Sequence, residues 1–255
     1  MIPEIRRVGQ HAALVANTKQ EMFGEFLTAH LGEEYHWSFD SGVLTFESEQ
    51  GSIQCDTYPI ASIAVDPATL LWRWQPLSEQ EAQYFRGEVS GHFREFGEQH
   101  GLTTFTSPEV PYEVGEDQAA TIAQVGHDII HAGYEIFGPN AVFYQARFNA
   151  AGSRLVWGLG NFRTEAGPIY VPTPDLLDVL IKADRLLMSV DDIGWSMDGL
   201  ARHFPGVDSK IDELIPGRSY KATYTEPTGM KHEIQWMYNE ARTELNLESK
   251  IGQKP

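Results

Sequence analysis

Alternation of apolar and polar residues predicts strands in much of the first third of the chain. Residues 35–39 and 43–46 alternate aromatic and polar side chains on either side of a turn at residues 40–42, which is typical of a hairpin. Residues 52–65 are a third β-rich segment. Pro59 interrupts that segment and predicts an edge or a bulge, because proline cannot donate to a sheet ladder. The short connections favour antiparallel pairing.

The next predicted strand is the aromatic run at residues 70–76, which ends in proline. In an extended strand, Trp72 and Trp74 point to one face, whereas Leu71 and Arg73 point to the other. Two neighbouring indoles bury a large apolar area, and each indole N–H requires a partner. We favour a packed core strand, because aromatic stripes more often serve packing than recognition. The alternative is the aromatic floor of a ligand pocket.

Helical spacing of apolar residues predicts the helices of the chain, and alternation predicts further strands after residue 101. The predicted helices cover residues 10–31, 78–100, 116–132, 173–187, 195–204 and 207–214. The further predicted strands cover residues 102–105, 142–148, 154–159, 219–224, 231–238 and 243–247. Ser78 and Glu81 are spaced as a capping box at the start of the second helix. At 173–175 a capping residue, a proline and an acid occur in the order that starts a helix.

Together these elements predict an α+β protein, a twisted antiparallel sheet with helices packed mainly on one face. Residues 164–172 change in composition, with two prolines and a glycine that favour a boundary or crossover. We therefore expect residues 1–162 to form an α+β domain built on the Trp72/Trp74 strand. Residues 163–255 would be a smaller helical and β-hairpin segment, which packs on that domain or forms a second one.

Charge and cysteine content restrict the classes of partner and compartment. The chain has 36 acidic and 19 basic residues, a formal net charge of −17. This charge argues against nucleic acid, whose phosphates require Lys and Arg, and against anionic membrane surfaces. It is compatible with a basic protein partner or a small molecule. Cys55 is the only cysteine, and no segment has the pattern of a signal peptide or a bilayer span. We expect a cytoplasmic protein.

Two histidines, His127 and His131, lie one helical turn apart and could share a metal ion. A zinc-peptidase pattern would need a glutamate after the first histidine, where Asp128 stands. We therefore favour two half-buried helix histidines, with a metal site as the alternative. Similarly, Asp191 and Asp192 could bind a divalent cation, but such residues more often cap the following helix.

Sequence motifs for catalysis are missing: the chain has no P-loop, no G-x-G-x-x-G and no G-x-S-x-G. We expect no cofactor. The leading hypothesis is a soluble, non-enzymatic protein that binds a small molecule or another protein. The alternative is a hydrolase-like enzyme with a small-molecule pocket over Trp37, Trp72 and Trp74.

The order of aromatic and glycine positions between Trp37 and Phe46, then residues 71–74, then an acidic capped helix, resembles a known bacterial family. That family has a W-x-W core strand and carries only a domain-of-unknown-function label. The resemblance covers residues 25–162 and implies the same order of elements. It implies no activity and no catalytic or binding residues, because none is established for the family.

Overall fold

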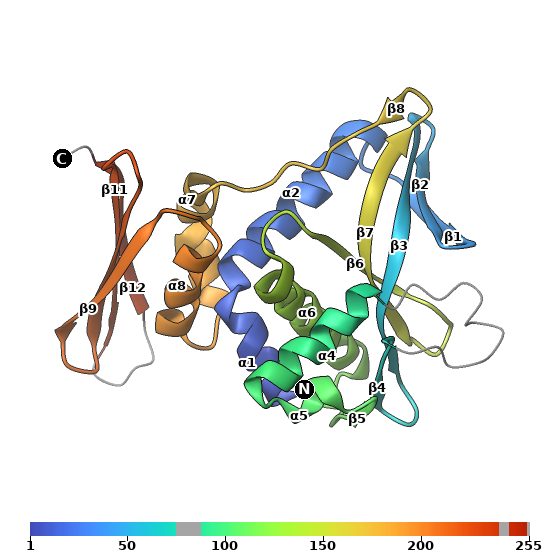
Figure 1. Cartoon of the computed structure of the whole chain (residues 1–255), viewed down its shortest axis with the longest axis horizontal. Coiled ribbons are helices and arrows are strands. Elements are labelled where there is room, and N and C mark those ends of the chain that lie inside the picture. Colours follow the sequence, from blue (N-terminus) through green and yellow to red (C-terminus); the bar gives the residue numbers. More distant parts are fainter. Residues whose placement is uncertain (75–87, 240–244, 254–255) are drawn as a thin grey trace. The chain divides into compact units, whose positions relative to one another are not determined.

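The computed structural model describes residues 1–74, 88–239 and 245–253, which form two compact units (Figure 1). The first unit comprises Met1–Gly9 and Lys19–Thr173, and the second comprises Gln10–Thr18 and Pro174–Pro255. The division along the chain thus falls at 173/174, and a short N-terminal segment belongs to the second unit. The domain boundary that we expect between residues 162 and 163 stays a prediction.

Within the described residues, the first unit contains an eight-stranded antiparallel sheet, which confirms the predicted α+β class. The order β1-β2-β3-β4-β5 forms one path, and β7 pairs with β3, β6 and β8. The strands are β1 (His36–Asp40), β2 (Val43–Ser48), β3 (Gly51–Ala64), β4 (Thr69–Trp72), β5 (Glu109–Pro111), β6 (Val142–Arg147), β7 (Arg154–Thr164) and β8 (Gly167–Pro168).

Strand β3 is paired along both of its edges. Because β7 runs beside β3 from Gln54 to Ile63, β2 and β4 must share the other edge. On that edge the Thr57 N–H donates to Gly42 O, and Ile60 O accepts from Arg73 N–H. Pro59 lies between these two bonds, where the partner of β3 changes from β2 to β4. Because proline has no N–H, this change leaves no donor unpaired at Pro59. The register with β7 shifts between Pro59 and Ala61, which confirms the predicted bulge.

Ring contacts show that this sheet is curled. Trp37 and Phe39 of β1 contact Trp157 of β7, with centroids 6.3 and 5.7 Å apart, although β2 and β3 separate these strands in the sheet. Phe46 of β2 contacts Tyr144 of β6 at 5.2 Å across β3 and β7. Contacts between such distant strands require the strong twist and coiling that bulges promote. Figure 1 shows the long strands β3 and β7 side by side.

The described helices of the N-terminal two thirds of the chain are α1 (Pro3–His11), α2 (Ala13–Leu31), α4 (Glu88–His100), α5 (Thr103–Thr106) and α6 (Gln118–Phe137). The single helix predicted for residues 10–31 is therefore two helices, separated at Ala12. Phe23, Phe26 and Leu27 of α2 share a hydrophobic cluster with side chains of the curled sheet. On α6, a Cβ at Gly133 would lie 2.7 Å from the Phe143 ring, so glycine permits the close approach to β6. The predicted capping box after β4 lies outside the described residues.

The strand predicted at residues 102–105 is wrong, because this segment forms α5. Two contacts outweigh the local β pattern. The Phe105 ring stacks on Trp72 with centroids 5.5 Å apart. The Glu4 carboxylate accepts from the Thr104 N–H at 3.0 Å and from its hydroxyl at 2.8 Å, which satisfies donors at the start of the turn.

Besides the helical segment Gln10–Thr18, the second unit contains a four-stranded antiparallel sheet, ordered β12-β11-β10-β9 within the described residues, and the helices α7 and α8. Its elements are α7 (Leu176–Leu186), α8 (Ile193–Arg202), β9 (Asp208–Ile215), β10 (Ser219–Thr225), β11 (Lys231–Tyr238) and β12 (Leu245–Gln253). The helix predicted for residues 207–214 is wrong, since continuous pairing with β10 holds this segment as β9. Asp175 and Asp178 form a capping box on α7. Asp192 accepts from the Trp195 N–H at 3.0 Å, which confirms the capping interpretation.

We predict unequal stability effects at the two indoles of the aromatic run. Trp72 is 1% exposed and its Nε1 donates to Thr104 O at 2.7 Å, whereas half-buried Trp74 donates to Phe105 O at 3.3 Å. Trp72→Phe should lower the free energy of unfolding by about 2 kcal/mol, through lost packing and a lost hydrogen bond. Trp74→Phe should lower it by less than about 1 kcal/mol. Urea unfolding followed by circular dichroism measures both, and equal losses would contradict this account.

Candidate functional site

A cavity of about 880 Å³ lies in the first unit, where the edge of β3 passes from β2 to β4. Its walls come from the end of β1 and the β1–β2 turn, from β3, from the residue after β4, and from the β6–β7 hairpin with the start of β7. Small-molecule sites in proteins have volumes of about 300–1,000 Å³. The cavity is therefore large enough for an organic ligand.

One wall of the cavity is aromatic. The rings of Phe39 and Trp157 stack with centroids 5.7 Å apart and an interplanar angle of 30°. Trp157 is 2% exposed and is also contacted by Trp37, which fixes its position. Phe39 remains 43% exposed, and Phe148 on the hairpin is also exposed. Exposed aromatic rings beside a cavity are the surface that an apolar ligand would remove from water.

The charged group that alternation directs toward the cavity is Arg73. Trp72 and Trp74 both bind carbonyls of α5, so the residue between them points to the opposite face of the strand. Ser62 of β3 pairs with Leu71 and thus lies on the same face as Arg73. Burial lowers the pKa of the Arg73 guanidinium, yet an arginine remains protonated at neutral pH.

A second arginine, Arg154, also borders the cavity. It pairs across the strands with Ile63 and its Nη1 donates to Gln145 Oε1 at 3.3 Å. Gln145 Nε2 in turn donates to the carbonyl of Ala123 on α6. These bonds direct the Arg154 side chain toward α6.

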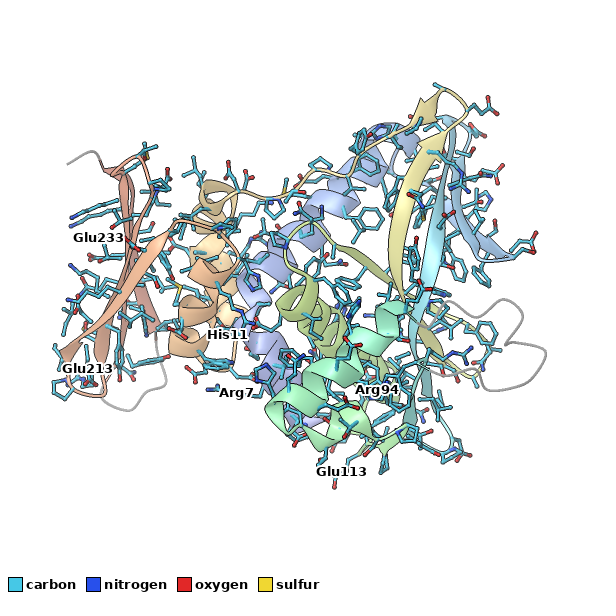
Figure 2. The ribbon with its side chains drawn as sticks, viewed as in Figure 1. Arg7, His11, Arg94, Glu113, Glu213 and Glu233 are labelled. Atoms are coloured by element: carbon cyan, nitrogen blue, oxygen red, sulfur yellow. The ribbon has the colours of Figure 1, made fainter. Side chains whose placement is uncertain are left out.

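The described residues of the lining differ in charge from the rest of the chain. Acidic side chains occur throughout the described part, for example Glu113 after β5, Glu213 on β9 and Glu233 on β11 (Figure 2). None of the described residues that line the cavity is acidic, although the sequence has 36 acids and 19 bases. The charged side chains among the described lining residues are those of Arg73 and Arg154.

The three tryptophans predicted to bind a ligand are placed differently from one another. Trp72 and Trp74 use their indole N–H groups on α5 carbonyls, and Trp72 packs against Phe93 and Phe105. None of the three lines the cavity, but Trp37 contacts Trp157, which does. A ligand-binding role for Trp37, Trp72 and Trp74 stays a prediction.

Sequence reasoning missed the residues that do line the cavity. Alternation correctly placed Arg73 on the face opposite the two indoles, and this was the sequence pattern that could have identified it as a lining residue. Phe39 and Trp157 lie far apart in the sequence, and only the curl of the sheet brings their rings together.

The two histidines of α6, His127 and His131, lie in an environment that favours the neutral imidazole. Burial lowers the pKa of His131 to about 3, with the charges of His127 and Arg6 acting in the same direction. Burial and the charge of Arg154 also lower the pKa of His127. Across residues 1–74, 88–239 and 245–253, no group of three or more His, Cys, Asp or Glu side chains could hold a metal ion. A metal site at these two histidines stays a prediction.

Asp128, which stands between the two histidines, has a structural contact. Its Oδ1 accepts from Arg6 Nη1 at 3.0 Å and from Gln124 Nε2 at 2.9 Å, and the residue is 2% exposed. The ion pair of Arg6 with Asp128 joins α1 to α6 inside the first unit. Removal of either partner would leave a buried charge without this compensation.

The fold and cavity define an α+β protein with a candidate ligand site in a curled antiparallel sheet. The chain belongs to a family of unknown function, DUF6882, whose family model matches residues 6–160. All described residues that line the cavity fall within the matched range. Neither a curated protein nor a solved structure matches the chain. None of the described helices is long and apolar enough to cross a bilayer.

We predict that His131 makes the stability of the protein sensitive to acid. Its folded-state pKa of about 3 lies below the ordinary value of 6.5, so the folded state binds fewer protons than the unfolded state between these pH values. The stability is present above pH 6.5 and falls as the pH drops toward 3, at up to about 1.4 kcal/mol per pH unit.

His131→Gln should therefore reduce the acid dependence of the melting temperature between pH 7 and pH 5, whatever it does to stability at pH 7. His36→Gln, at an exposed position on β1, serves as the control and should leave that dependence unchanged. An unaltered acid dependence in His131→Gln would show that the histidine is solvated in the folded state.

Proposed function

We propose that the protein is a small-molecule-binding protein whose ligand places an apolar body against Phe39 and Trp157. The observation that carries the proposal is the cavity of about 880 Å³ bordered by a partly exposed ring stacked on a buried one. Covering an exposed aromatic ring contributes both apolar burial and ring contact to affinity. The volume suits one organic molecule rather than a peptide segment of a partner.

The chemistry of the lining supports binding rather than catalysis. The described residues around the cavity include serines, Thr57 and Asn149, but no His, Asp, Glu, Cys, Lys or Tyr. A serine nucleophile requires an adjacent general base, and none of these described residues can supply one. Cys55 does not line the cavity, and burial raises its pKa to about 12, so its thiol is inert.

Binding can be measured with N-phenyl-1-naphthylamine, a neutral apolar probe whose fluorescence rises in apolar sites. We expect saturable binding of one probe per chain. Phe39→Ala should weaken the affinity about tenfold, because the probe loses a ring contact and apolar burial. Tyr170→Ala is the matched control: Tyr170 is 87% exposed and does not line the cavity, so its removal should have no effect.

A second pair of variants tests the location without removing a ring. Ser62→Phe adds a side chain to the cavity wall and should displace the probe. Ser52→Phe makes the same change at a half-buried serine of β3 outside the cavity and should retain binding. The proposal is wrong if the probe binds equally well to Phe39→Ala and Ser62→Phe, or does not bind the wild-type protein at all.

A further inference from the structure

We propose that a second, smaller cavity of the first unit binds a tetrahedral oxyanion, phosphate or sulfate, between Arg147 and Arg154. The inference goes beyond the proposed function, because it concerns another cavity and another class of ligand. Three observations carry it. The two arginines are paired across neighbouring strands, neither has an acidic partner in the described part of the chain, and a small cavity lies beside them.

The two arginines lie directly opposite each other on β6 and β7. Arg147 is the Cα partner of Arg154 in the antiparallel pairing, so both side chains leave the sheet on the same face. Gln145, two residues before Arg147, lies on this face too, and its Nε2 donates to the Ala123 carbonyl of α6 at 3.2 Å. Both arginine side chains therefore leave the sheet on the side of α6.

The two like charges are not balanced within the described part of the chain. The Arg154 Nη1 donates to Gln145 Oε1 at 3.3 Å, and this acceptor is a neutral amide. The exposed side chain of Arg147 has neither a hydrogen bond nor an ion pair among the described residues. Like charges directly opposite on neighbouring strands destabilise a sheet. An anion held between the two guanidinium groups would replace this repulsion with charge-assisted hydrogen bonds.

The cavity beside the arginines has a volume of about 90 Å³. Its walls are the two arginines, residues 150–152 of the β6–β7 hairpin and the first turns of α6, and all of them belong to the first unit. Sites for organic ligands have volumes of about 300–1,000 Å³, so this cavity suits one inorganic ion or one ionic group of a larger molecule. Arg154 borders both cavities, whereas Arg147 does not line the larger one.

A tetrahedral oxyanion matches the donors on this face. A guanidinium remains protonated at neutral pH and presents N–H groups in a fixed fork that fits two oxygens of a phosphate. Two guanidinium groups on neighbouring strands can each take different oxygens of one anion. The carboxylate of Asp117, which precedes α6, accepts from the Ala120 N–H at 2.9 Å and is not paired with either arginine.

Thermal unfolding of the full chain in a phosphate-free buffer, with sodium chloride balancing the ionic strength, measures the binding. Millimolar inorganic phosphate or sulfate should raise the melting temperature saturably, and chloride should not. Arg147→Gln should raise the half-saturating concentration about tenfold, through the loss of a charged hydrogen bond. Arg147→Lys should fall between wild type and Arg147→Gln. In chloride alone, Arg147→Gln should melt no lower than wild type, because it removes the like-charge opposition.

The control variant is Arg94→Gln, which removes the same charge from α4 outside both cavities (Figure 2) and should respond to phosphate as wild type does. Both anions stabilise proteins generally at high concentration, and that effect is the same in all variants. Glycerol 2-phosphate separates two sources of the anion: it binds as inorganic phosphate does if the site takes a phosphate group of a larger molecule, and does not bind if the site takes the free ion.

Equal responses to phosphate in wild type and Arg147→Gln, or no response in wild type, would overturn the inference. Arg147→Gln should leave the affinity for N-phenyl-1-naphthylamine within about twofold, since Arg147 does not line the larger cavity and no charged hydrogen bond to this neutral probe is lost. Failure of the oxyanion site with retained binding of that probe would therefore leave the proposed function standing.

Discussion

The pairing of β3 on both edges is the constraint from which the architecture of the first unit follows. Since β7 occupies one edge from Gln54 to Ile63, the other edge has to be divided between β2 and β4. The division falls at Pro59, where the chain has no N–H to leave unpaired. The cavity lies at this division, with the β1–β2 turn on one side and Arg73 on the other. A discontinuity in hydrogen bonding therefore positions the candidate site.

Aromatic side chains pack across the curled sheet beside this division and form one wall of the cavity. The curl of the sheet brings Trp37 and Phe39 onto Trp157, and Phe46 onto Tyr144. Phe46 and Trp157 are buried, Trp37 and Tyr144 are half-buried, and Phe39, near the end of β1, keeps part of its ring exposed. The same aromatic cluster thus stabilises the fold and provides an apolar wall for a ligand.

Local pattern in the sequence predicted those features that depend on neighbouring residues. Alternation placed Trp72 and Trp74 on one face, the missing N–H of Pro59 predicted the bulge, and the capping role of Asp192 followed from its position before a helix. Long-range contacts decided the features that were wrong. Residues 103–106 form a helix because of Trp72 and Glu4, and Asp208–Ile215 forms a strand because of β10. The site could not be predicted, since its aromatic wall depends on the curl that pairing β3 with β7 permits.

The central claim is that a ligand contacts Trp157 in the curled sheet, and fluorine NMR of the 5-fluorotryptophan-labelled protein tests it most directly. The chain has six tryptophans, and single Trp→Phe variants assign their resonances. Addition of N-phenyl-1-naphthylamine should shift the resonance of Trp157 and leave buried Trp236 of the second unit unchanged. A shift at Trp236 with none at Trp157, or no shift at any of the six under saturating probe, would contradict the account.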